Sequence, residues 1–261
     1  MSVVLNDKPR QSTLKWRWPL SRQLTLSVAT LAVLLAVWWA VAALQLISPL
    51  FLPPPGQVLQ KLIAIAGPQG FMDATLWQHL AASLTRIVIA LLAAVLLGVP
   101  VGIAMGLSPT VRGILDPLIE LYRPVPPLAY LPLMVIWFGI GELSKVLLIY
   151  LALFAPLLIA TAAGVRRVDR SRVQAVRCLG ASRWQVVRYV ILPSALPEVL
   201  TGLRIALGVG WSTLVAAELI AANRGLGFMV QSAAQFLATD VVVVGILLIA
   251  ARSEEHTSEL Q

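Results

Sequence analysis

The chain has 261 residues, of which 59% are apolar and only 12% are charged. Soluble domains carry about 25% charged residues, so this composition excludes an ordinary soluble protein and indicates a membrane protein. The net charge of +8 comes largely from basic residues gathered between apolar segments, a pattern that fits the positive-inside rule better than a nucleic-acid-binding surface. The single cysteine, Cys178, excludes an internal disulfide and a cysteine-only metal site.

Apolar segments recur along the whole chain. A helix needs about 20 apolar residues to cross the hydrocarbon core of a bilayer. The first segment is too long for a signal peptide and follows a polar stretch, 1–23, which favours an uncleaved anchor. We therefore predict an all-α, polytopic membrane protein of about six transmembrane helices, at 24–47, 80–107, 125–140, 143–165, 195–222 and, truncated, 241–251.

Basic residues in the connections predict the orientation of the chain. They are frequent in 1–23, present in 108–124 and most frequent in 166–192, whereas the connections between these are poor in them. We therefore predict a cytoplasmic N-terminal segment, 1–23, followed by a transmembrane domain, 24–251.

The end of the chain differs from the rest. Segment 241–251 is about half as long as a crossing requires. The polar stretch that follows, 252–261, resembles the translation of a sequencing-library adapter. We predict that 252–261 is a non-native tail.

The most basic connection predicts two short helices joined by a tight turn. Asp169 is a suitable N-cap for the first helix, and Gly180 suits the left-handed position that ends it. Ser182 and Gln185 have the spacing of a capping box for the second helix, which we expect to end at Pro193. An ordinary positive-inside loop is the alternative that the arginines alone do not exclude.

Signatures of catalysis are missing from the sequence. It contains no G-x-x-x-x-G-K-[ST] loop for nucleotide phosphates and no HExxH pair for a metal. The two histidines, His79 and His256, lie far apart in the sequence. We therefore predict no catalytic residues, no metal and no cofactor in this chain.

Polar residues inside the predicted spans are costly and therefore informative. We predict that Glu218, deep in the fifth span, faces a polar cavity or a subunit interface. Ser212 and Thr213 either line a translocation path with Glu218 or hydrogen-bond back to their own helix. For Arg86 and Arg204, near the ends of their spans, snorkelling to the membrane interface is an equally good explanation.

Two further patterns concern the backbone. Pro124, Pro126 and Pro127 interrupt regular helix, and the freed carbonyls must be buried in protein or face water, which makes these prolines a candidate gate. A plain kink is the alternative. Small residues at four-residue spacing in the second span predict close helix packing: Gly98, Gly102 and Gly106.

Several segments resemble the permeases of ATP-binding cassette (ABC) importers. In the basic connection, the order Gln174-Ala175-Val176, Gly180 and Val190-x-Leu192-Pro193 is similar to their Glu-Ala-Ala signature loop, with Gln174 in place of the glutamate. Segments 122–133, 137–141, 208–220 and 51–55 resemble the nitrate/sulfonate/taurine permease family in particular.

The resemblance implies a type I ABC importer permease fold in the bacterial inner membrane and transport of taurine. It implies as partners a second copy of the chain, membrane lipid, a periplasmic binding protein and a cytoplasmic ATPase that carries ATP and Mg. Another alkanesulfonate or a nitrate-like anion is the alternative cargo, and a stand-alone secondary transporter the alternative class. The residues that it assigns to coupling with the ATPase are Gln174, Ala175, Gly180, Leu192 and Pro193.

Overall fold

The computed structural model describes residues 20–258, so most of the predicted N-terminal segment and the last residues of the predicted tail lie outside it. Within this range all regular elements are helical, apart from an isolated β-bridge between Phe71 and Ala74. The chain divides into two compact units, 1–55 and 56–261, which are described separately.

The first unit is essentially one apolar helix, α1 (Leu20–Ala43). Its apolar side chains are largely exposed in the single chain, as expected of a helix that meets lipid. The predicted anchor is confirmed as a helix of sufficient length and apolarity, although it ends at Ala43 and not at 47. Within this helix, the indole of Trp38 donates a hydrogen bond at 3.1 Å to the carbonyl oxygen of Pro53, which follows the helix.

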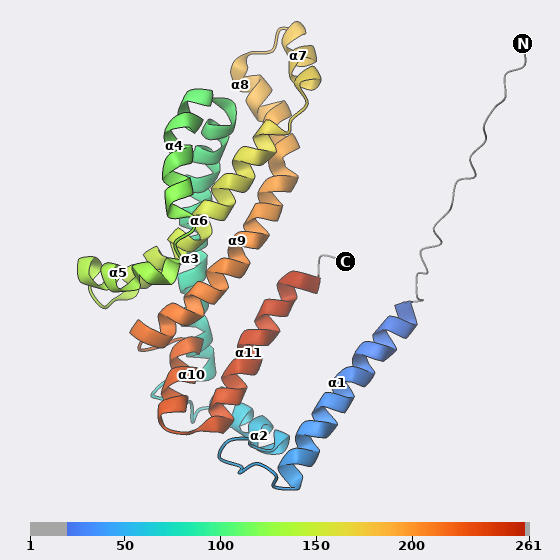
Figure 1. Ribbon diagram of the computed structural model, residues 1–261, viewed down its shortest axis with the longest axis vertical. Helices are drawn as coiled ribbons and strands as arrows, with labels where there is room; N and C mark the ends of the chain where they lie inside the picture. Colours follow the sequence, from blue (N-terminus) through green and yellow to red (C-terminus); the bar gives the residue numbers. More distant parts are fainter. Residues whose placement is uncertain (1–19, 259–261) are drawn as a thin grey trace, which may run out of the picture. The chain divides into compact units, whose positions relative to one another are not determined.

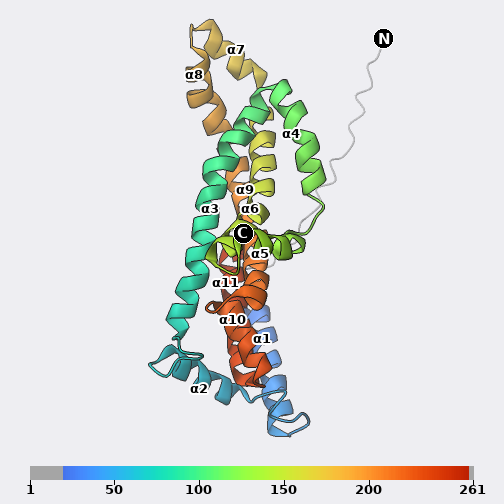
Figure 2. The same ribbon diagram turned by 90° about the vertical axis from the view of Figure 1, so that its left-hand side faces the viewer.

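The second unit is built around three long helices. Figures 1 and 2 show α3, α6 and α9 side by side, with α6 in contact with both neighbours. The elements of this unit are α2 (Pro55–Ala66), α3 (Leu76–Leu107), α4 (Pro109–Tyr122), η1 (Pro127–Tyr130), α5 (Leu131–Phe138), α6 (Glu142–Arg166), α7 (Arg170–Cys178), α8 (Arg183–Val186), η2 (Val187–Ile191), α9 (Leu192–Ala221), α10 (Leu226–Gln235) and α11 (Thr239–Ser258).

Small residues allow α3 to approach α6 closely, as the glycine spacing predicts. A Cβ at Gly102 would lie 2.7 Å from the Cβ of Thr161, and one at Gly106 would lie 2.6 Å from the Cβ of Val165. Both distances are far below van der Waals contact. Close packing of this kind is the main source of helix association in lipid, where apolar surfaces gain nothing from leaving water.

The predicted span 125–140 is found as a shorter apolar helix, Pro127–Phe138. A helix, α4, occupies most of the predicted connection 108–124, and the apolar residues after it form only the short helices η1 and α5. Ser108 caps α4 by accepting from the backbone N–H of Val111, and Pro109 follows in the first turn, where its missing N–H costs nothing. The prolines after Tyr122 interrupt the helix between α4 and η1, so the apolar residues form a separate short helix.

The predicted ends of two other elements also change. The predicted fifth span, 195–222, begins earlier because η2 runs directly into α9 at Leu192. The last helix, α11, continues past Ala251 to Ser258, so no break in the helical backbone separates 241–251 from the start of the predicted tail. The non-native origin of 252–261 stays a prediction.

Four helices in the described residues are long and apolar enough to cross a membrane, and two shorter apolar helices accompany them. The long ones correspond to the first, second, fourth and fifth predicted spans, and the short ones to the third and sixth.

Candidate functional site

The turn between α7 and α8 has the geometry predicted for the basic connection. Asp169 accepts a hydrogen bond from the N–H of Ser171 at 2.9 Å and caps α7. Gly180 has φ +84°, its N–H donates to the carbonyl of Arg177, and the N–H of Ala181 donates to the carbonyl of Val176. This pair of bonds is a Schellman motif, which requires the left-handed conformation that glycine adopts without a steric penalty.

The capping box of α8 is confirmed as well. The N–H of Gln185 donates to Ser182 Oγ at 3.3 Å, and the N–H of Ser182 donates to Gln185 Oε1 at 2.8 Å. Beneath the turn, Val186 is buried against Val165 and Ala195 at the ends of α6 and α9. The α7–α8 turn is therefore capped at each helix start and anchored in the helical core.

The expected end of the second helix at Pro193 is wrong. The N–H of Leu192 donates to the carbonyl of Val187, five residues earlier, so one π-turn links α8 to α9. The π-turn precedes the proline, and Pro193 then lies in the first turn of α9, where no N–H is needed. The α7–α8 turn is consequently joined to α9 by continuous helix.

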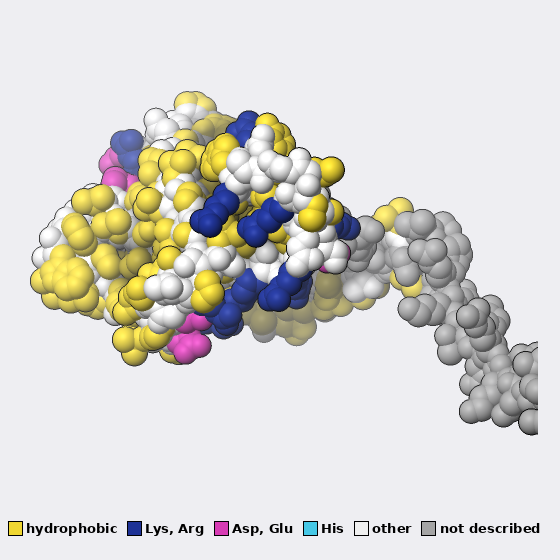
Figure 3. Space-filling model, turned by 90° about the horizontal axis from the view of Figure 1, so that it is seen from above, with side chains coloured by type: hydrophobic (Ala, Val, Ile, Leu, Met, Phe, Trp, Pro, Cys, Tyr) yellow, Lys and Arg dark blue, Asp and Glu magenta, His cyan; other side chains and the backbone are white. Residues whose placement is uncertain are grey.

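The outer face of this turn combines basic and apolar side chains. Leu179, Trp184 and Tyr189 are 86%, 66% and 68% exposed. Figure 3, which views this end of the molecule, shows Lys and Arg side chains interspersed with hydrophobic ones. Of the predicted coupling residues, the turn exposes Gln174, Ala175 and Gly180, whereas Leu192 and Pro193 lie at the start of α9.

Toward the other end of α9, the side chain of Glu218 is buried and fully paired. Arg86 Nη1 lies 2.6 Å from its Oε1, Ser83 Oγ lies 2.8 Å from the same oxygen, and the N–H of Gly227 donates to Oε2 at 3.0 Å. Glu218 is 1% exposed. The carboxylate thus ties α3, α9 and the start of α10 together. Its predicted role in a translocation path stays a prediction.

Arg86 extends this cluster to α6 and does not snorkel. Its guanidinium binds the carboxylate of Glu142 through Nε at 2.5 Å and Nη2 at 2.8 Å, and it donates to the carbonyl of Arg224. Lys145 Nζ lies 2.7 Å from Glu142 Oε1. We call Arg86, Glu142, Lys145 and Glu218 the charge cluster; its two cations balance its two anions.

Most of the residues around Glu218 were not among the predicted site residues. His79 Nδ1 accepts from the N–H of Gly225 at 3.2 Å, and its Nε2 lies 3.0 Å from the carbonyl oxygen of Phe71, so Nε2 carries the proton. His79, Ser83 and Arg86 follow one another at intervals of four and three residues, which places them on one helix face. A polar face on an otherwise apolar helix is therefore the sequence pattern from which these three residues could have been predicted.

Gly225 is required by this arrangement. Its φ is +137°, and a Cβ there would lie 2.5 Å from both carboxylate oxygens of Glu218. The glycine-containing stretch at the start of α10 therefore serves the close approach of backbone to a buried carboxylate.

Ser212 and Thr213 hydrogen-bond back to their own helix, one of the two predicted alternatives. Ser212 Oγ donates to the carbonyl of Gly208 at 3.2 Å and is exposed, and Thr213 Oγ1 donates to that of Val209 at 2.9 Å and is buried. A contribution of the exposed Ser212 to a path remains compatible with this geometry.

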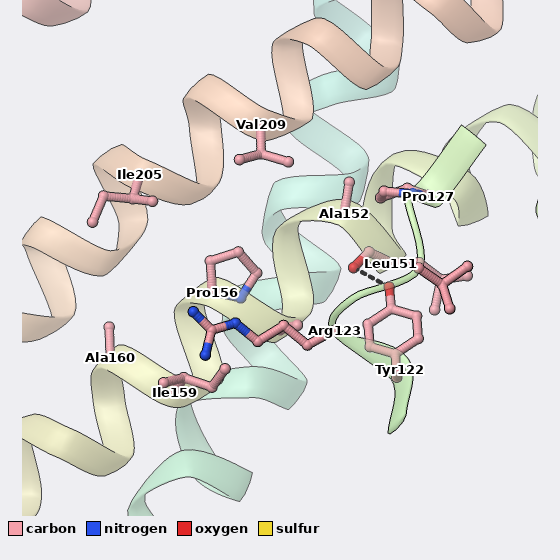
Figure 4. Close-up of a pocket in the computed structure, with 12 residues that line it drawn as sticks. Tyr122, Arg123, Pro127, Leu151, Ala152, Pro156, Ile159, Ala160, Ile205 and Val209 are labelled. Atoms are coloured by element: carbon pink, nitrogen blue, oxygen red, sulfur yellow. Dashed lines mark hydrogen bonds between the residues drawn. The ribbon is translucent and has the colours of Figure 1, made fainter. Parts of the chain in front are cut away.

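A cavity of about 400 Å³ lies beside the proline-rich break. Figure 4 shows Tyr122 and Arg123 at the end of α4, opposite residues of α6 and α9, with the hydroxyl of Tyr122 donating to the carbonyl of Leu151. Of the three candidate gate prolines, Pro127 lines the cavity, whereas Pro124 and Pro126 are exposed and do not.

Residues 94–252, more than half of the chain, match the family model described as "Binding-protein-dependent transport system inner membrane component". The chain belongs to this family. It is 77% identical to the taurine transport system permease protein TauC of Escherichia coli (strain K12), over 96% of this chain and 91% of that protein. It is 40% identical to the putative aliphatic sulfonates transport permease protein SsuC of the same strain, over 83% and 81%.

The fold agrees with the family. A crystal structure of an amino acid ABC transporter with histidines superimposes with a TM-score of 0.59, covering 70% of this chain and 89% of that one at 21% identity. The chain therefore has the type I ABC importer permease fold and is an inner-membrane transport subunit. It is not an enzyme, since in such importers ATP is hydrolysed by a separate subunit and a binding protein delivers the substrate.

Proposed function

We propose that this permease translocates taurine across the inner membrane. The observation that carries the proposal is the 77% identity with the taurine permease of E. coli over nearly the whole chain. This chain is also 40% identical to the aliphatic sulfonates permease of E. coli. That similarity supports a substrate with a sulfonate group. A longer alkanesulfonate is therefore the second candidate cargo.

The path would run between two copies of the chain. The cavity beside the proline-rich break is lined by α4, α6, α9 and the break itself, which form one wall and leave the opposite side to a partner. A homodimer supplies an identical wall across a two-fold axis. Exposed apolar side chains on the outer face of α3, such as Leu92, Leu96 and Leu97, are suited to contact with membrane lipid.

The N-terminus and the α7–α8 turn would lie in the cytoplasm, in agreement with their basic residues. There the turn would dock on the ATPase, which would bind ATP and Mg, and this chain would need no cofactor of its own. A turn that is capped by Asp169 and Ser182 and continuous with α9 transmits a displacement into the membrane domain.

The test is uptake of labelled taurine in cells that lack their own taurine permease and express this chain with its ATPase and binding protein. We expect ATP-dependent uptake of taurine to exceed that of longer alkanesulfonates. The reverse preference would favour the second candidate, and the absence of any sulfonate uptake by a complex that is present in the membrane would refute the proposal.

A further inference from the structure

Arg123 lies well inside the membrane domain. Helix α4 starts directly after the end of α3 and has 14 residues, so its far end lies about 21 Å from that turn. Residues Leu151 to Ile159, which face Arg123 across the cavity, are in the middle of α6. Since the hydrocarbon core is about 30 Å thick, these positions place the arginine at membrane depth.

Arg123 is exposed in the single chain, and its guanidinium has no partner in the part of the chain that the structure describes. Among the described residues, none of the ion pairs or side-chain hydrogen bonds involves it. Arg86, nearer the end of its own helix, is by contrast paired with two carboxylates. An unpaired charge at membrane depth is costly unless it faces water or an anion, so the position of Arg123 requires an explanation.

The rest of the cavity is small and apolar. Its walls include Ala152, Ala155, Pro156 and Ala160 of α6, with Ile205 and Val209 of α9. Figure 4 shows the guanidinium of Arg123 directed along this wall. A volume of about 400 Å³ is within the range of small-molecule sites, and one charged group among apolar walls is the usual way in which such a site fixes a ligand's orientation.

We propose that Arg123 binds the sulfonate group of the substrate as it passes this cavity. A sulfonate presents three oxygens to a planar guanidinium, which can donate two parallel hydrogen bonds to such a group. The short alkyl part would lie against the alanines of α6, where larger side chains would leave no room. This inference rests on the proposed function, because it assigns the contact that a sulfonate makes inside the permease.

A carboxylate of the second copy is the competing partner. Glu120 precedes Arg123 by three residues, is exposed, and forms no ion pair among the described residues. An intersubunit pair between the two residues would make Arg123 structural. The experiment must therefore separate the loss of a substrate contact from the loss of such a pair.

The test compares Arg123→Gln with Arg123→Lys in the complete importer. Because a charged hydrogen bond contributes about 1.5–3 kcal/mol, we expect the maximal uptake rate of Arg123→Gln to fall about ten- to hundredfold. KM should hardly change, since the binding protein captures the substrate. Lysine should restore part of the rate. Arg112→Gln, on the same helix but paired with Asp116, is the matched control and should transport normally.

Direct binding provides a second measurement. Taurine should raise the thermal stability of the purified permease–ATPase complex, ethanolamine, which lacks the sulfonate, should not, and the taurine effect should vanish in Arg123→Gln. Normal uptake and normal taurine stabilisation of this variant would overturn the inference while leaving the proposed function intact. If Glu120→Gln lowers uptake as strongly, and the double variant is no worse, the intersubunit pair is correct and the inference is wrong. A wild-type complex that transports no sulfonate would refute both.

Discussion

Single residues decide how the buried charges are held. Glu218 lies in an apolar helix, yet both of its oxygens have partners and its charge is balanced by Arg86. Removing one member of a buried ion pair leaves an uncompensated charge, whereas removing both members costs less. The two single variants are not equivalent here, because Arg86 retains Glu142 when Glu218 is neutralised.

Arg86→Gln should therefore be more damaging than Glu218→Gln. The first change leaves a buried carboxylate without a cation, at a cost of about 3–5 kcal/mol; the second leaves a neutral amide that still accepts from Ser83 and Gly227. The double variant should be more stable than Arg86→Gln alone. Thermal unfolding of the detergent-solubilised complex measures this order, with the half-exposed Arg112–Asp116 pair as a control expected to contribute about 1 kcal/mol or less. Equal losses in the two single variants would contradict the assignment.

The sequence identifies Glu218 as unusual but not its partners. A carboxylate within an apolar run stands out by itself, since charge is rare at membrane depth. Arg86 lies 132 residues earlier in the chain, and no local rule links positions so far apart. The spacing of His79, Ser83 and Arg86 predicts that they share one helix face. The contact of this face with α9 and α10 depends on the tertiary fold and cannot be predicted from spacing.

At the scale of elements, the α7–α8 turn connects the proposed docking surface to the long helix α9. Its conformation depends on Gly180, where a Cβ would meet no atom within 4 Å. The constraint is therefore the positive φ alone, which disfavours most side chains by about 1–2 kcal/mol. Asparagine tolerates this region better than a β-branched residue does.

Gly180→Val should consequently uncouple transport from ATP hydrolysis. Distortion of the turn would weaken its transmission to α9, so taurine uptake should fall severalfold while the chain still inserts into the membrane. Gly180→Asn should retain most of the uptake. The rates of taurine uptake and of ATP hydrolysis are measured together in proteoliposomes. The control is Gly113→Val, a substitution at an open helical position without positive φ. Unchanged uptake per ATP hydrolysed in Gly180→Val would count against the coupling role.

Helix caps and tight turns are predictable from the sequence, because they depend on the type and spacing of nearby residues. Helix boundaries and changes of hydrogen-bond register are less predictable. The caps at Asp169 and Ser182 and the left-handed Gly180 follow from residue type and spacing. Helix α4 was missed because Arg112 and Asp116 lower its hydropathy, although they pair with each other along the helix. The π-turn before Pro193 was missed because proline normally marks a helix end, and a shift of hydrogen-bond register leaves no signature in residue type.

At the scale of the molecule, the three long helices α3, α6 and α9 carry different features at their two ends. The α7–α8 turn lies at one end of these helices, and the charge cluster joins α3, α6 and α9 at the other. The long helices can be predicted from hydropathy. The association of two copies and the direction of insertion are properties of the assembly. The orientation can nevertheless be tested directly on this chain.

Cys178 is the single cysteine of the sequence and is exposed at the end of α7. In a cell that is otherwise wild type, a membrane-impermeant maleimide should therefore label the permease in inside-out vesicles and not in intact spheroplasts. Addition of the ATPase should protect the thiol, because the proposed docking surface covers this turn. The variant Cys178→Ser with Asn223→Cys, which moves the thiol to the connection between α9 and α10, should show the opposite labelling. Labelling of Cys178 from outside would reverse the proposed orientation of every helix and remove the α7–α8 turn from reach of a cytoplasmic ATPase.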